Sequence, residues 1–218
     1  MTHTKFNEIL SKGIATDTFL ADLNYNVYRK IFDRVNHSRL EKTEQKLFNY
    51  IRINAKENAI LSIARVYDSE SKKYKTRCID ELINNSVGIS ISYPFELFPN
   101  KWEEFESKYK LIFDKMEVDK MEPQNYIRHF IAFYRKFKTS DSSFQHLKNW
   151  RDKILAHNEP FDSSELNIDF EEIEFLILIP KSIIEYASTF MDTENSIIMF
   201  DGRSDSYFID DLISKYVG

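Results

Sequence analysis

The chain has 218 residues, enough for one well-buried core. Hydrophobic residues make up 42% and aromatic residues 15%, which excludes a disordered protein, and a net charge of -5 excludes a globally basic nucleic-acid binder. With 4 glycines and 5 prolines the chain has too few turn signals for a β-sandwich or barrel, so long helices are expected.

Two long amphipathic helices are predicted in the first third of the chain. After a short helical turn at residues 6–11, Thr16 or Thr18 could cap a helix that runs to about residue 37. A second helix is predicted over residues 41–67, where small side chains allow close helix approach. A basic loop at 69–75 then leads to a shorter helix that ends near residue 84.

The middle of the chain predicts three more helices after an unpatterned connection at residues 85–100. The first covers residues 102–116, and the second begins at Pro123 and runs to about residue 137. A Ser-Asp-Ser sequence at 140–142 provides a cap for the third, the central helix.

The C-terminal third predicts one long helix and an undecided segment. Asp169 or Glu171 begins the helix, and Pro180 must kink or break it. Residues 196–209 could form a small hairpin, or a loop could precede a last helix near residues 210–216. The expected fold is therefore an all-α, up-and-down bundle over residues 1–193, with an irregular C-terminal appendage over residues 194–218.

The location of the protein follows from what the sequence lacks. The single cysteine, Cys78, cannot form an internal disulfide. Neither a leader sequence nor an apolar run long enough to cross a bilayer is evident, so a soluble cytoplasmic protein is expected. The five histidines show no paired metal-ligand spacing, and we expect no metal and no cofactor.

Charge is distributed unevenly along the chain. Residues 126–157 contain seven basic and two acidic residues, whereas residues 158–218 contain three basic and fourteen acidic ones. A basic middle would let a polyanion dock locally although the whole chain is acidic. The alternative is that two helix faces of opposite sign pack together.

The most compact group of potentially reactive side chains ends the central helix, at residues 149–159. On a helical wheel Arg151 lies on the apolar side with Leu147, Ile154, Leu155 and Asn158, so it must pair with a buried carboxylate or open into a cleft. His157 is six residues further on, about 9 Å along the axis and about 120° round. Both groups could reach one phosphate if the helix unwinds before Pro160, or if two copies meet across a two-fold axis.

These residue types suit RNA cleavage without a metal. A guanidinium matches two phosphoryl oxygens and stabilises charge in the transition state, and an imidazole can transfer protons near neutral pH. Arginine-histidine spacing alone is a weak signal, because about 0.7 such pairs are expected by chance in a chain of this composition. A histidine at a helix end is also more often a cap than a catalytic residue. The candidate residues are catalytic Arg151 and His157, supporting Asp152 and Asn158, and substrate-binding Lys148 and Lys153.

The stretch from Arg151 to His157 resembles the signature of HEPN domains, in which an arginine, a polar residue and a few more residues precede a histidine at the end of a late helix. The wider pattern is similar to the abortive-infection (AbiU-type) subgroup, whose long early helix ends in a sequence like that of residues 63–68. The resemblance covers roughly residues 19–187.

The resemblance implies a homodimeric bundle with a composite site at the dyad. Active members are metal-independent endoribonucleases that leave cyclic phosphate ends, acting as toxins or antiviral effectors, with an antitoxin or defence-system protein as a partner. A related toxin class carries a tyrosine two residues after the histidine, where this chain has Glu159. Since some members lack nuclease activity, the alternative is a non-catalytic module binding a nucleotide, RNA or protein, with Arg151 in a structural ion pair and His157 as a cap.

Overall fold

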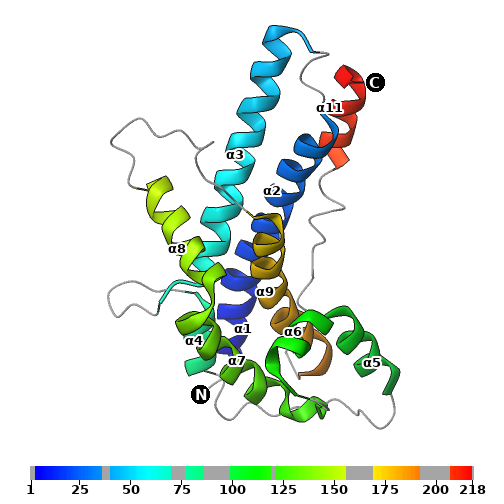
Figure 1. Ribbon diagram of the computed structural model, residues 1–218. Coiled ribbons are helices and arrows are strands. Elements are labelled where there is room, and N and C mark those ends of the chain that lie inside the picture. The colour runs from blue at the N-terminus through cyan, green and yellow to red at the C-terminus, as the bar shows by residue number, and fades with distance from the viewer. Residues whose placement is uncertain are drawn as a thin grey trace.

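The computed structural model describes residues 3–35, 40–69, 77–85, 99–118, 121–155, 169–191 and 207–217. Within these ranges every regular element is helical, and the protein is an all-α helical bundle, as predicted (Figure 1). No helix in the described part is long and apolar enough to cross a membrane.

The N-terminal helix is continuous where a break was predicted. Helix α1 (His3–Ile9) passes through a π-helical segment, η1 (Leu10–Ile14), into α2 (Ala15–Arg34), and Ile14 keeps helical backbone angles. The predicted cap at Thr16 or Thr18 is therefore wrong. The hydroxyl of Thr16 instead donates to the carbonyl of Ser11, five residues back, at 3.2 Å.

Among the described helices, α2 and α3 make the most extensive contact with each other (Figure 1). Helix α3 (Lys42–Val66) begins at Glu41 with a capping box, in which Glu41 and Glu44 satisfy each other's backbone N–H groups. The helix predicted over residues 41–67 is confirmed. Ala55, Ala59 and Ser62 are buried, which allows the close approach that their small size predicts.

As Figure 1 shows, the helices between residues 79 and 140 form the end of the molecule that lies away from α11 (Tyr207–Val217). They are α4 (Ile79–Asn84), α5 (Pro99–Lys108), α6 (Lys110–Met116), the 3-10 turn η3 (Pro123–Asn125) and α7 (Tyr126–Ser140). The single helix predicted over residues 102–116 is divided at Tyr109, whose backbone leaves the helical region. Aromatic rings fill the space between these helices and α9, with Trp102 and Phe105 in contact with Tyr126, Tyr186 and Phe190.

The two remaining long elements begin at the predicted caps. Asp141 accepts the backbone N–H of Ser143 at 2.9 Å and begins α8 (Ser142–Leu155). Asp169 accepts the N–H of Glu171 at 2.9 Å and begins α9 (Phe170–Phe190), which contacts α2, α3 and α8. Both caps satisfy backbone donors that would otherwise lack an intrahelical partner.

Helix α9 continues through Pro180, so of the two predicted outcomes, a kink or a break, the break does not occur. A proline has no N–H to donate to the carbonyl four residues earlier, which here belongs to Leu176. The hydroxyl of Tyr67, at the end of α3, donates to that carbonyl at 2.8 Å. The contact therefore compensates for the missing helical hydrogen bond and joins α3 to the middle of α9.

The C-terminal segment contains a helix, α11 (Tyr207–Val217), which is one of the two predicted alternatives. Its Ile209 and Ile213 are buried in a second apolar cluster with residues of α2 and α3. The carboxylate of Asp210 pairs with Lys30 at 2.7 Å and also with Arg34, both on α2. The division into a bundle over 1–193 and an appendage over 194–218 stays a prediction.

Candidate functional site

The side chain of Arg151 joins helix α8 to the end of α3. Its Nη1 lies 2.9 Å from Oδ1 of Asp68, while Nε and Nη2 lie 2.9 and 2.8 Å from Oδ1 of the adjacent Asp152. The Arg151 side chain is 28% exposed and that of Asp68 is 42% exposed. The arginine is therefore paired, as one alternative required, but its partner is partly exposed rather than buried.

The apolar pattern of α8 explains why Arg151 lies at the edge of the core. Leu147, Trp150 and Ile154 are buried, and Arg151 flanks them at the side where α8 meets α3. Leu155 was expected on the buried side, but it is 65% exposed. Since Trp150 also belongs to the buried face, the centre of that face is turned away from Leu155 on the wheel.

Asp68 is positioned by the residue before it. Tyr67 is the C-cap of α3, and its ring is buried against Tyr134, Phe137 and Phe144. Burial raises the pKa of Tyr67 well above its ordinary value, so its hydroxyl remains neutral and donates to the Leu176 carbonyl. With Tyr67 fixed in the core, Asp68 projects from the end of α3 toward α8.

The two predicted lysines lie on different sides of α8. Lys148 is three residues from Arg151 and about 60° round the helix, on the same flank, with its Nζ 5.8 Å from the Phe144 ring centroid. Lys153 is about 160° round from Arg151. Helix α8 therefore presents Lys148 on the same side as Arg151, and Lys153 on nearly the opposite side. His157 and Asn158 lie outside the described residues.

A second ion pair involves Arg65, which lies on α3 three residues before Asp68. Nε of Arg65 lies 3.1 Å from Oδ1 of Asp17 on α2. Burial raises the pKa of Asp17, against the lowering effect of Arg65, and the charge of Asp68 raises it further. Together Asp17, Arg65, Asp68, Arg151 and Asp152 carry a formal charge of -1, so a phosphate here needs further cations such as Lys148.

Sequence reasoning missed two partners in this region. Asp68 ends the stretch that carries the AbiU-type resemblance, and an acidic residue directly after a helix end was the available signal. His146 was also given no role, although its Nδ1 lies 2.9 Å from both carboxylate oxygens of Glu172 on α9. Nothing in the spacing of His146 and Glu172 indicates this contact, because it depends on how α8 packs on α9.

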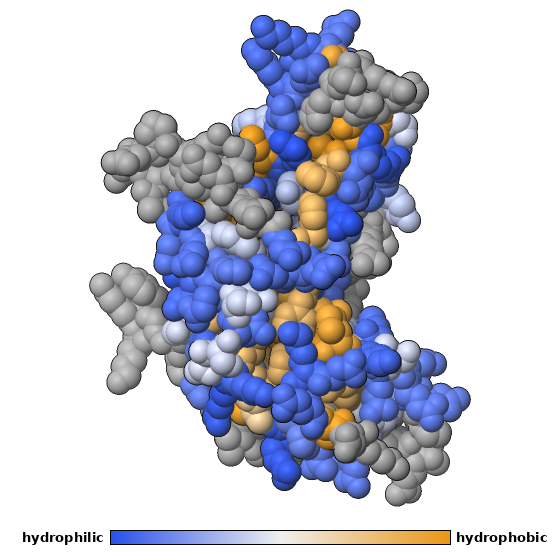
Figure 2. Space-filling view, viewed as in Figure 1, coloured by the Kyte–Doolittle hydropathy of each residue, from blue (hydrophilic) through white to orange (hydrophobic). Residues whose placement is uncertain are grey.

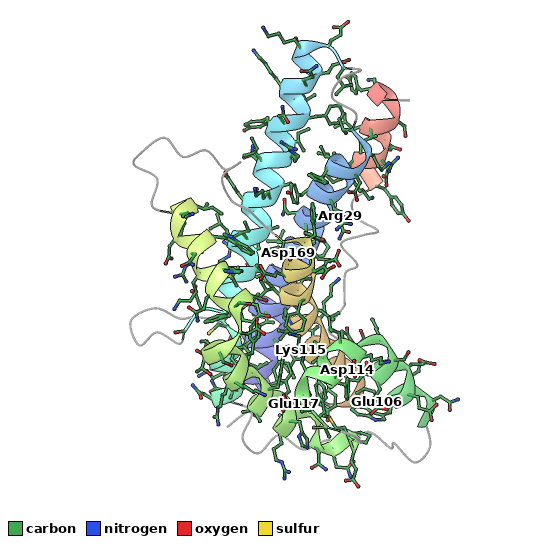
Figure 3. All side chains as sticks on the ribbon, in the orientation of Figure 1. Arg29, Glu106, Asp114, Lys115, Glu117 and Asp169 are labelled. Atoms are coloured by element: carbon green, nitrogen blue, oxygen red, sulfur yellow. The ribbon has the colours of Figure 1, made fainter. Side chains whose placement is uncertain are left out.

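A separate cleft of about 690 Å³ lies between α2, α6 and α9. Its apolar lining includes Phe175, Ile177 and Leu178, and hydrophobic atoms are visible in the corresponding part of Figure 2. Figure 3 labels Arg29 of this lining on α2. The ionisable groups of the lining carry a net charge of -2, which makes this cleft unsuitable for a polyanion: Asp22, Asp33, Glu171 and Glu174 against Arg29 and Lys181.

The helical bundle and the arginine near the end of a late helix define a protein of the HEPN class. A family model described as AbiU2, of the HEPN domains, matches residues 4–192, and the chain belongs to this family. The resemblance predicted from residues 151–157 and 63–68 is thereby confirmed, and the chain is a HEPN-type module of the abortive-infection kind. Comparisons with curated proteins and with solved structures give no match.

Proposed function

We propose that the protein is a metal-independent endoribonuclease that acts as a toxin or antiviral effector in abortive infection. Membership of the AbiU2 family supports the proposal, because active HEPN domains cleave RNA. Arg151 and His157 are the proposed catalytic residues, and the substrate is RNA. No metal or cofactor takes part in the proposed reaction.

The observation that carries the proposal is the state of the Arg151 guanidinium. It is partly exposed, and its contacts within the described residues use three of its five N–H donors. Of the contacts in the described part of the chain, none uses the other two donors, which are available for phosphoryl oxygens. Lys148 lies on the same flank of α8. A fixed guanidinium with unused donors can stabilise the charge that develops on a phosphate in the transition state.

The proposed reaction is an internal transesterification. His157 accepts the proton of a ribose 2′-hydroxyl, whose oxygen attacks the adjacent phosphorus. The bond from phosphorus to the 5′-oxygen breaks, and that oxygen takes a proton from an imidazolium. The products are a 2′,3′-cyclic phosphate and a free 5′-hydroxyl.

The proposal includes a homodimer whose two copies build the site. If the helical geometry of α8 continued to His157, six residues would place it about 9 Å along the axis and about 120° round from Arg151, and a single rigid helix could not direct both at one phosphate. Two-fold symmetry brings the arginine of one copy to the histidine of the other. A defence-system protein or antitoxin would then control the assembled dimer.

The test is RNA cleavage by purified protein in EDTA, with the product ends identified chemically. We expect cyclic phosphate ends, a bell-shaped pH profile near neutrality, and rate losses of about 100-fold or more for Arg151→Ala and His157→Ala. Thermal melts of both variants verify folding. Undiminished cleavage by either folded variant would refute the assignment.

One observation favours a second candidate function, a non-catalytic module that binds a nucleotide, RNA or protein. The Arg151–Asp68 pair joins α8 to α3 and can be purely structural. In that case Arg151→Ala lowers the melting temperature, and the wild-type protein has no cleavage activity to lose. Measuring stability and cleavage on the same samples separates the two functions.

A further inference from the structure

We propose that Asp68 is a positioning residue that fixes the orientation of the Arg151 guanidinium for phosphate binding. This inference rests on the proposed ribonuclease function and extends it to a residue on a different helix. Asp68 would contact Arg151 and not the RNA. Three features of the structure support it.

The first feature is that Asp152 alone leaves the guanidinium free to turn. Both bonds from Arg151 to Asp152 go to the same oxygen, Oδ1. Asp152 is also the next residue of the same helix, so it moves with Arg151. Asp68 contacts the third nitrogen, Nη1, from the end of α3, and this contact fixes the plane relative to the rest of the fold.

The second feature is that Asp68 is itself held in place. Its backbone N–H donates to the carbonyl of Arg65 at 3.4 Å, and Tyr67 beside it is buried. The Tyr67 hydroxyl reaches the Leu176 carbonyl in α9 at 2.8 Å. A side chain on such a support can orient a catalytic group, because its own backbone has little freedom.

The third feature is the local charge. Arg151 with Asp68 and Asp152 has a formal charge of -1, which opposes the approach of a phosphate. Asp68 should therefore weaken RNA binding while improving the orientation of the bound phosphate. These opposing effects give different signatures in KM and kcat, which a purely structural ion pair would not give.

Two substitutions separate charge from position. In Asp68→Asn the amide oxygen still accepts from Nη1 but the negative charge is lost, so we expect KM to fall severalfold with kcat within about twofold. In Asp68→Ala the acceptor is lost, so we expect kcat to fall roughly 10- to 100-fold. Adding Asp68→Ala to Arg151→Ala should reduce activity no further, because the two residues act as one unit.

Asp33→Ala is the matched control. Asp33 pairs with Nε of Arg29 at 2.8 Å and is 47% exposed, close to the 2.9 Å and 42% of Asp68. This variant removes an ion pair of similar length and exposure, which lies within α2 rather than between two helices, and should leave kcat and KM unchanged. An equal fall of kcat in both variants, or an unchanged or raised kcat in folded Asp68→Ala, would overturn the inference.

A readout without RNA distinguishes failure of this inference from failure of the proposed function. Rotation of the Arg151 Nη1 group, followed by nitrogen NMR, should be slow in wild type and Asp68→Asn and fast in Asp68→Ala. If the wild type does not cleave RNA, the ribonuclease proposal fails, and the positioning role in catalysis fails with it, even where rotation is slow. If the wild type cleaves RNA but rotation is already fast, only the inference about Asp68 fails.

Discussion

At the scale of single residues, the contact between Tyr67 and the Leu176 carbonyl gives a direct stability test. Replacing Tyr67 by Phe leaves a buried carbonyl in α9 without a donor, which we expect to cost about 1–3 kcal/mol of unfolding free energy. Chemical denaturation measures this cost. Tyr50→Phe, at a residue that is 68% exposed, should change stability by less than about 0.5 kcal/mol.

The same contact predicts a coupling between two distant residues. Pro180→Ala restores an N–H that can donate to the Leu176 carbonyl, so Tyr67→Phe should be less costly in that background. A double-mutant cycle gives the coupling energy. Additive effects would mean that the Tyr67 hydroxyl does not compensate for the proline.

At the scale of elements, the close approach of Arg77 to the π-helical segment η1 depends on Gly13. A Cβ there would lie 2.2 Å from Cβ of Arg77 and 2.8 Å from its carbonyl oxygen, so the backbone before α4 would have to move. We expect Gly13→Ala to destabilise the protein by about 1–3 kcal/mol, although alanine favours helices. Lys12→Ala, exposed in the same segment, is the control for thermal melts and should have little effect. Equal melting temperatures for the two variants would show that the backbone at Arg77 can move away from the added Cβ without a loss of stability.

The packing of helix α11 should depend on pH. The hydrogen bond from Lys30 and the nearby charge of Arg34 lower the pKa of Asp210 below its usual 3.8. Because the native-state pKa is lowered, this stabilisation is present above pH 3.8 and is lost as pH falls through the lowered pKa. Hydrogen exchange of residues 207–217, corrected for intrinsic rates, should be faster in Asp210→Asn at neutral pH, and this difference should vanish in acid. A constant difference would contradict the prediction.

At the scale of the whole molecule, the sequence predicts most helices but not the joins between them. Apolar spacing predicts α3, and local caps at Asp141 and Asp169 also predict α8 and α9, since these side chains lie next to the helices that they begin. The continuity through residues 10–14 was not predicted, because it is accompanied by the close approach of Arg77, which precedes α4. At Pro180 the sequence left a kink and a break open, and the contact with Tyr67 at the end of α3 accompanies the continuous helix.

The candidate site, too, was predictable from the sequence only in part. The identity of Arg151 and its place near the end of a late helix follow from local sequence and family pattern. Its partner Asp68 is 83 residues away in the chain, so only the packing of α8 on α3 brings the two together. The separation of Lys148 from Lys153 follows from helical spacing alone, whereas the exposure of Leu155 depends on the buried position of Trp150.

The support that Tyr67 gives to α9 has a consequence for how related sequences vary. The Tyr67 hydroxyl at the end of α3 replaces the N–H donor that Pro180 lacks in α9, so selection should act on the two positions jointly. In an alignment of AbiU2 relatives, sequences with a residue other than proline at 180 should tolerate phenylalanine at 67, and those with proline should retain tyrosine.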